Sequence, residues 1–280
     1  MTKIDPGCAA IVAAFRRRNL RSRAPSAVAA RDPMFRRRGS SFDLKSIREY
    51  QSFDDPRAID WKLYGRTDRA YVKEFYDEAS EGIAFLIDGS GSMSIPDCDE
   101  YRSCIASLAF ILTSLGMGVN SWIFDRALRG NRISTRHPSD VRRLIEALDG
   151  MEANGPTDTT KAYLALRSMR GERRIFVFSD FHETLPRLAP PSAGSLFLIR
   201  FRVPFPSVAP SGAELEIEDP ENGELVVVPW DRAEEAAWRR TEDEREKRLS
   251  SGGPRAPYYR LDPGQNRMPV YRDILERLYG

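Results

Sequence analysis

The sequence feature that most constrains the fold is a continuous apolar segment that ends on an acidic residue. Residues 82–87 read Gly-Ile-Ala-Phe-Leu-Ile, Asp88 follows them, and the next four residues are Gly-Ser-Gly-Ser. An unbroken apolar run of this length, closed by turn residues, is typical of a strand buried on both faces. Such a strand needs helices on either side of its sheet, so this segment indicates an α/β domain.

Strands and helices alternate along much of the remaining chain. We expect further strands over 119–124, 174–180 and 196–201, with the first of them hairpinned onto 127–133. Helical spacing and end signals predict helices over 101–116, 138–148, 159–169, 231–249 and 269–278. This order predicts a central, mostly parallel sheet with helices on both faces.

The flanking segments complete the expected organisation. Alternating side chains at 47–53 and 70–76 predict a β-rich N-terminal extension over 41–80. It precedes an α/β core over 81–210, and a hairpin (213–218 with 225–228) and C-terminal helices then complete the domain over 211–280. The length of the chain suits one large domain with a modest appendage.

Charge is concentrated at the start of the chain. The first 38 residues contain ten basic and two acidic residues, although the whole chain has a net charge of +2. We expect residues 1–40 to form a flexible basic leader with a short helix around residues 9–18; the alternative is a contact with nucleic acid, acidic lipid or an acidic protein surface. No apolar run reaches the roughly 18 residues that a membrane span needs. Three cysteines without metal-ligand spacing, and no export signal, suggest reduced thiols and a cytoplasmic protein.

Oxygen-bearing side chains follow two of the expected buried strands. Asp88 ends the first, Ser90 and Ser92 come next on a glycine turn, and Asp180 ends a later strand. Ligands of open α/β sheets bind at the carboxyl ends of strands, so we expect these groups to meet, joined by Thr157 from a loop before a helix. An all-oxygen cluster suits Mg²⁺, or alternatively Mn²⁺ or Ca²⁺, and disfavours zinc and copper. A plain turn whose serine caps the next helix is the competing interpretation.

These motifs carry a resemblance to known families. Residues 88–92, 155–158 and 178–180 resemble the metal-ion-dependent adhesion site of von Willebrand factor A domains. Over roughly residues 34–280 the chain resembles the bacterial domain-of-unknown-function family 58. The segments that carry this second resemblance are 46–50, 54–62, 66–67, 71–75 and 219–224, of which 57–62 is the most distinctive. The resemblance implies a von Willebrand factor A-like (Rossmann-like) core.

The resemblance also implies a function. Members of the family are thought of as non-enzymatic adaptors or chaperone cofactors that act with a MoxR-type AAA+ ATPase. By similarity, Ser90, Ser92 and Thr157 would approach the metal directly, while Asp88 and Asp180 would act partly through water. The remaining coordination position would accept a carboxylate of an unknown client protein, since a cation held partly by neutral hydroxyls retains positive charge. Two departures are that many relatives carry membrane helices before this domain, and that residues 200–206 lack an expected acid.

A second group of residues lies in the distinctive stretch of the extension. Arg57, Asp60, Trp61, Lys62 and Arg66 form a candidate docking surface, for example for the ATPase. The alternative is structural: Asp60 would pair with Arg57 or Arg66 to lock a β-rich flap onto the core, and Trp61 would pack.

Two other functions stay open as alternatives. A Mg²⁺-dependent phosphohydrolase would use the cation to activate water, with His182 as the candidate base. A nucleic-acid-binding protein would use the basic leader, although the chain lacks a glycine-rich phosphate-binding loop. Turnover of phosphate esters and salt-sensitive retention on DNA would distinguish these two from an interaction module, whose binding is sensitive to EDTA.

Overall fold

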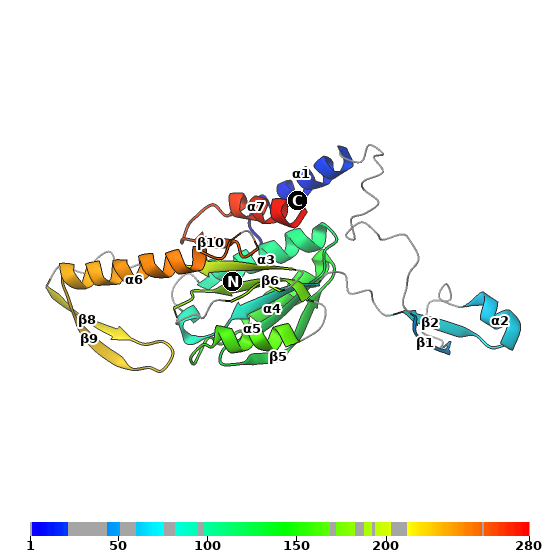
Figure 1. Ribbon diagram of the computed structural model, residues 1–280, viewed down its shortest axis with the longest axis horizontal. Helices are drawn as coiled ribbons and strands as arrows, with labels where there is room; N and C mark the ends of the chain where they lie inside the picture. The colour runs from blue at the N-terminus through cyan, green and yellow to red at the C-terminus, as the bar shows by residue number, and fades with distance from the viewer. Residues whose placement is uncertain are drawn as a thin grey trace. The chain divides into compact units, whose positions relative to one another are not determined.

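The computed structural model describes residues 2–21, 44–50, 60–75, 82–94, 98–168, 172–182, 188–191, 194–202, 212–253 and 255–279. The chain divides into two compact units, Met1–Ser22 with Gly82–Gly280, and Arg23–Glu81. The larger unit contains the central sheet, and the smaller unit contains a short pair of strands and a helix (Figure 1).

The larger unit is built on a six-stranded sheet with the strand order β10-β7-β6-β3-β4-β5. Its strands are β3 (Gly82–Asp88), β4 (Val119–Phe124), β5 (Leu128–Thr135), β6 (Glu172–Ser179), β7 (Ser195–Phe201) and β10 (Tyr258–Leu261). Neighbouring strands are parallel except β4 and β5, which form the expected hairpin. The mostly parallel sheet is therefore confirmed. If the six strands are renumbered 1 to 6 in chain order, their spatial order from the β5 edge is 3-2-1-4-5-6, as in doubly wound folds. The direction of this order reverses between β3 and β6.

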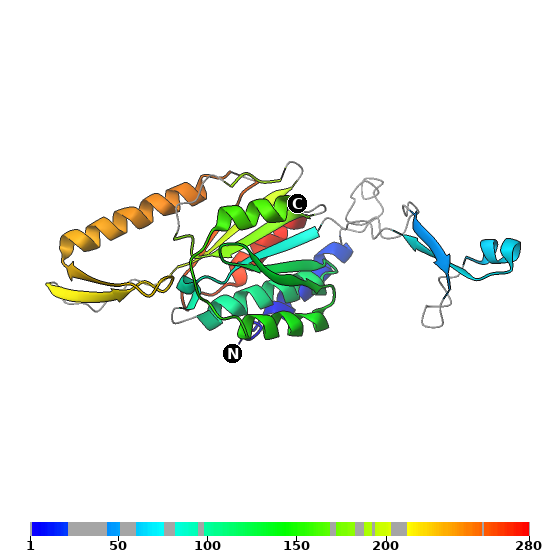
Figure 2. The same ribbon diagram turned by 90° about the horizontal axis from the view of Figure 1, so that it is seen from below.

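Helices cover both faces of this sheet (Figure 2). Ala84 of β3 belongs to a core that it shares with residues of α5 (Thr159–Ser168). Its neighbour Phe85 points to the other face, where its ring lies 4.9 Å from that of Phe178. On that face lies α3 (Cys98–Ser114), which contacts β4. Adjacent residues of a strand point to opposite faces, so burial on both sides explains why β3 is apolar without interruption.

The N-terminal segment differs from the flexible leader that we expected. Residues Cys8–Arg21 form α1, which contacts α3 and α7 (Met268–Tyr279). Its buried face consists of Cys8, Ile11, Val12 and Phe15, none more than 7% exposed. This i, i+3, i+4, i+7 spacing is that of an amphipathic helix. A short helix was expected around residues 9–18, so for this segment only the expected flexibility is wrong. The rest of the expected leader, residues 22–40, lies outside the described residues.

The smaller unit contains one antiparallel pair and a helix. β1 (Leu44–Glu49) pairs with β2 (Tyr71–Phe75), close to the strands expected there. Between them α2 (Trp61–Thr67) is a helix where we expected a purely β-rich segment. The Asp60 carboxylate caps this helix by accepting a hydrogen bond from the Leu63 N–H at 3.3 Å.

After the fourth parallel strand the chain forms a hairpin and a long helix. β8 (Ala213–Glu218) and β9 (Leu225–Trp230) pair antiparallel, as expected, and α6 (Arg232–Ser250) follows them. Asp231 caps α6 through hydrogen bonds from two backbone N–H groups, which fixes where the helix begins. The remaining short elements are η4 (Gly91–Ser94), η5 (Pro138–Asp140) and α4 (Val141–Asp149). Among the helices in the described ranges, none combines the length and apolarity needed to cross a bilayer.

Candidate metal site at the switch point

Two acidic residues mark the carboxyl ends of the central strands. Asp88 is the last residue of β3, and Asp180 directly follows β6. These neighbouring strands flank the point where the strand order reverses, which is where open α/β sheets bind ligands. The sheet topology therefore brings together the two carboxylates that the sequence singled out.

The Asp88 carboxylate organises the hydroxyl groups around it. Its Oδ1 accepts a hydrogen bond from the Ser90 N–H at 2.9 Å, which holds the glycine turn against the end of the strand. Its Oδ2 accepts from the Ser179 hydroxyl at 2.6 Å and from the Thr157 hydroxyl at 3.4 Å. Sequence reasoning missed Ser179; its signal was its position at the end of a buried strand, next to Asp180.

The loop after β3 places two hydroxyls side by side. Ser90 Oγ and Ser92 Oγ lie 3.1 Å apart, and both residues are buried. The loop is tied to the segment that carries Thr157, because the Gly91 N–H donates to the Gly155 carbonyl at 2.9 Å. Backbone hydrogen bonds thus fix the relative positions of the two loops that supply hydroxyl groups.

Asp180 has an unsatisfied oxygen. The side chain is 1% exposed, and its Oδ1 accepts a hydrogen bond from the His182 N–H at 3.2 Å. Its Oδ2 is buried and has no hydrogen-bond partner among the described residues. The next residue, Phe181, has a φ of +51°, an unusual backbone conformation for a bulky side chain. A buried carboxylate oxygen without a partner is costly, and a bound cation would compensate it.

The electrostatics of the site favour a cation as well. The pKa of Asp88 is raised to about 7, first because the carboxyl group is buried and second because the charge of Asp180 lies nearby. Hydrogen bonds from Ser179 and Ser90 act in the opposite direction but do not cancel these effects. A divalent cation held by these residues would favour the ionised form of Asp88.

The donor set defines what could bind. Within the described part of the chain, no group of three or more histidine, cysteine, aspartate or glutamate side chains is placed to hold a metal ion. The candidate site instead combines two carboxylates with neutral hydroxyls. The residues that would hold a divalent cation are Asp88, Ser90, Ser92, Thr157 and Asp180. These are the oxygen donors that Mg²⁺ and Ca²⁺ prefer, so the residues fit the expected ion.

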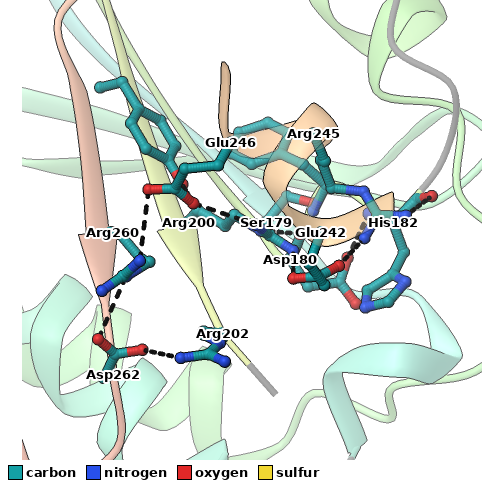
Figure 3. Close-up of polar contacts among 12 residues, drawn as sticks. Ser179, Asp180, His182, Arg200, Arg202, Glu242, Arg245, Glu246, Arg260 and Asp262 are labelled. Atoms are coloured by element: carbon teal, nitrogen blue, oxygen red, sulfur yellow. Dashed lines mark hydrogen bonds and ion pairs between the residues drawn. The ribbon is translucent and has the colours of Figure 1, made fainter. Parts of the chain in front are cut away.

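Charged residues of β7 and α6 hold the loop that carries Asp180 in place (Figure 3). Arg200, 2% exposed, donates from Nε to the Asp180 carbonyl at 2.9 Å and from a terminal nitrogen to Glu242 at 2.7 Å. Arg245 pairs with the same glutamate and donates to the His182 carbonyl at 3.2 Å. Sequence reasoning missed Arg200, although a charged residue inside an apolar strand was a signal.

The second predicted group lies in the smaller unit. Within the smaller unit Trp61 is 64% exposed, and its ring contacts that of Tyr64 with centroids 6.0 Å apart. Asp60 caps α2, and Arg66 lies in the last turn of that helix. Arg57 and the Lys62 side chain lie outside the described residues.

The chain has distant likenesses among solved structures, including the following three. Protein BatB from Bacteroides thetaiotaomicron is 13% identical with a TM-score of 0.41, over 71% of this chain and 99% of that one. An aerotolerance-related membrane protein from Bacteroides fragilis NCTC 9343 is 16% identical with a TM-score of 0.41, over 71% and 98%. An uncharacterized membrane spanning protein from Vibrio fischeri is 15% identical with a TM-score of 0.26, over 70% and 98%. No curated protein matches the sequence.

The fold and the site define the class of the protein. It is an open, doubly wound α/β domain with carboxylate and hydroxyl oxygens gathered at its switch point. The chain belongs to the family described as protein of unknown function DUF58, whose family model matches residues 46–248. The family resemblance inferred from the sequence is thereby confirmed.

Proposed function

We propose that this protein is a von Willebrand factor A-like interaction module that binds a partner carboxylate through a divalent cation. The observation that carries the proposal is the buried, unpartnered Oδ2 of Asp180 beside the hydroxyls that Asp88 organises. A metal-free turn gives no reason to keep a carboxylate oxygen buried and unsatisfied. A cation site at this position gives such a reason, because the ion would compensate the charge of that oxygen.

The hydrogen bonds of the candidate ligands support a metal site that has one coordination position left for a partner. Both carboxylate oxygens of Asp88 already accept hydrogen bonds, so this residue is suited to orient the hydroxyls of Ser179 and Thr157. Ser90 and Ser92 then supply neutral oxygens to the ion. Because neutral ligands do not cancel the charge of the ion, a further carboxylate is attracted to it.

We propose that the partners are a MoxR-type AAA+ ATPase and a client protein that offers the carboxylate. Family resemblance supports the ATPase, and the exposed Trp61 of the smaller unit offers it a contact. We assign no catalytic role, since His182 is exposed and contacts Asp180 through its backbone N–H. Its imidazole is therefore not used to orient the acidic pair.

Metal binding is the first test. Titration of the metal-free protein with Mn²⁺ or Mg²⁺ should show one site in the wild type and none in a Ser90→Ala/Ser92→Ala double variant that keeps its circular dichroism spectrum. Ser139→Ala, which removes an exposed hydroxyl from η5, is the matched control and should bind normally. Unchanged affinity in the double variant would contradict the site.

Partner binding is the second test. Capture of a purified MoxR-type ATPase should fall on addition of EDTA and recover with excess Mg²⁺. The same loss is expected for the double variant without EDTA. Equal capture by the wild type and the double variant would reject a cation-bridged contact even if the metal binds.

A further inference from the structure

A turn from a distant part of the chain lies against the candidate metal loop. The β8–β9 hairpin runs beside α6 and turns at residues 219–224 (Figure 1). A Cβ atom added to Gly91 would lie 1.9 Å from the Pro220 carbonyl oxygen and 3.0 Å from the Glu221 Cα. The turn backbone therefore packs directly on the loop between Ser90 and Ser92, an approach that only glycine permits.

The turn has a defined conformation. Asp219 closes it by accepting the Glu221 N–H on its carboxylate at 2.9 Å and the Gly223 N–H on its carbonyl at 2.7 Å. Gly223 has a φ of +73°, and the Asn222 side chain accepts the Glu224 N–H at 2.7 Å. These bonds build a tight turn that presents Pro220 and Glu221 to the metal loop.

Four of the five candidate ligands are shielded from solvent, whereas Thr157 is partly exposed. Asp88 and Ser90 are fully buried, Asp180 is 1% exposed and Ser92 is 8% exposed. A partner carboxylate can reach them only if a covering segment moves. Besides the Thr157 loop, the 219–224 turn is a segment that contacts Gly91, and it is acidic, so it carries the chemistry that the site would recognise in a partner.

We infer that the 219–224 turn is an internal ligand of the site, with Glu221 as the carboxylate that a partner must displace. The inference rests on the proposed function. Glu221 is chosen because it is half-buried beside Gly91, whereas Asp219 uses its carboxylate to close the turn and Glu224 is exposed. In the resting protein the turn occupies the coordination position that the partner needs, so binding requires the hairpin to move.

Displacing the hairpin from the metal loop should require little free energy. Ile217, Leu225, Val226 and Val227 are each between 46% and 59% exposed, and Trp230, where β9 ends next to α6, is the apolar residue of the hairpin strands that is buried. Segments with few buried apolar contacts open most easily. The hairpin continues into α6, whose Arg245 donates to the His182 carbonyl in the Asp180 loop and whose Glu242 accepts from Arg200.

The experiment uses the full chain with Mn²⁺ and acetate as probes. Water-proton relaxation counts the water molecules on bound Mn²⁺, and acetate titration measures access of a carboxylate to the ion. Glu221→Gln removes the charge of the internal ligand, and Gly91→Ala pushes the turn away by steric overlap. Glu224→Gln, in the same turn but exposed, is the matched control.

In both test variants we expect about one more water among the roughly six positions of the ion. If the turn occupies its position about nine-tenths of the time, the apparent Kd for acetate falls about tenfold. Glu224→Gln should behave like the wild type. If the wild type and Glu221→Gln both bind Mn²⁺ with the same hydration and the same acetate affinity, the internal-ligand role is wrong while the proposed function stands. If the wild type binds no Mn²⁺, both are wrong.

Discussion

At the scale of single residues, two buried carboxyl groups dominate the energetics of the site. Asp88 receives hydrogen bonds from the Ser90 N–H and the Ser179 hydroxyl, yet burial and the charge of Asp180 keep its pKa near 7. Asp180 adds an oxygen with no hydrogen-bond partner among the described residues. Without a cation, this pair therefore opposes folding near neutral pH, which is a common cost of a preorganised binding site.

The first prediction concerns the pH dependence of the metal-free protein. The pKa of Asp88 lies at 3.8 in an unperturbed chain and about 7 in the fold. Between these values the folded state holds the extra proton, so the free energy of unfolding falls as the pH rises. In EDTA, the stability of the wild type relative to Asp88→Asn should decrease by roughly 3 kcal/mol from pH 4 to pH 8.

Urea denaturation at several pH values measures this difference. Saturating Mg²⁺ is the control, because ion binding favours the ionised carboxylate and should raise the stability of the wild type alone at high pH. Parallel pH profiles for the two proteins in EDTA would show that Asp88 ionises normally.

At the scale of elements, α6 braces the loop that carries Asp180. Arg200 of β7 is buried and bonded both to the Asp180 carbonyl and to Glu242 of α6. Removing one member of a buried ion pair leaves the other charge without compensation in a medium of low polarity. The position of the Asp180 loop therefore depends on a helix that follows it by about fifty residues.

The second prediction tests this brace with a double-mutant cycle. Glu242→Gln should destabilise the protein by about 2 kcal/mol, since the buried Arg200 charge then keeps only its longer pair with Glu246 at 3.4 Å. The loss of stability in the double variant Glu242→Gln/Arg200→Met should be at least about 1 kcal/mol smaller than the sum of the losses in the two single variants. Urea denaturation provides the free energies. Glu146→Gln, which breaks an exposed pair with Arg142, should change stability by no more than about 0.5 kcal/mol. If the effects of Glu242→Gln and Arg200→Met simply add, these two residues are not energetically coupled.

The elements also show what the sequence could and could not predict. The apolar runs of β3, β6 and β7 predicted the sheet because burial on both faces removes polar alternation. β10 was missed, since its four residues Tyr258–Leu261 become a strand only by pairing with β7. The carboxylates and hydroxyls of the site followed from strand ends. Arg200 and the turn over Gly91 did not, because both depend on contacts between segments far apart in the chain.

At the scale of the whole molecule, the N-terminal segment belongs to the larger unit. Phe15 of α1 is 7% exposed, and its ring lies 6.0 Å from that of Tyr279 in α7. Before α1, Asp5 accepts hydrogen bonds from Arg267 at 2.8 Å and from Tyr271 at 2.6 Å. The first described residues and α7 are therefore held together on one side of the sheet, and Arg16, Arg17 and Arg18 are exposed on a packed helix.

The third prediction follows from this packing. Phe15→Ala should lower the free energy of unfolding by about 3 kcal/mol, because it removes a buried aromatic side chain. Arg17→Ala, an exposed change two residues away, should alter it by less than about 0.5 kcal/mol. Denaturant titration of the full chain distinguishes the two variants. Equal, small effects would mean that α1 is not docked in solution and that the flexible leader was the better description.

The fourth prediction separates the two units by their response to the cation. A ligand at 100 times its Kd stabilises the fold that binds it by about 2.7 kcal/mol. All candidate ligands and the covering turn belong to the larger unit, whereas β1, α2 and β2 belong to the other. Saturating Mg²⁺ should therefore slow amide hydrogen exchange at residues 88–94, 154–158, 179–182 and 219–224 and leave 44–75 unchanged. Ser90→Ala/Ser92→Ala should abolish the protection. Protection confined to 44–75 would instead place cation binding in the smaller unit, and the oxygens at the switch point would then need a different explanation.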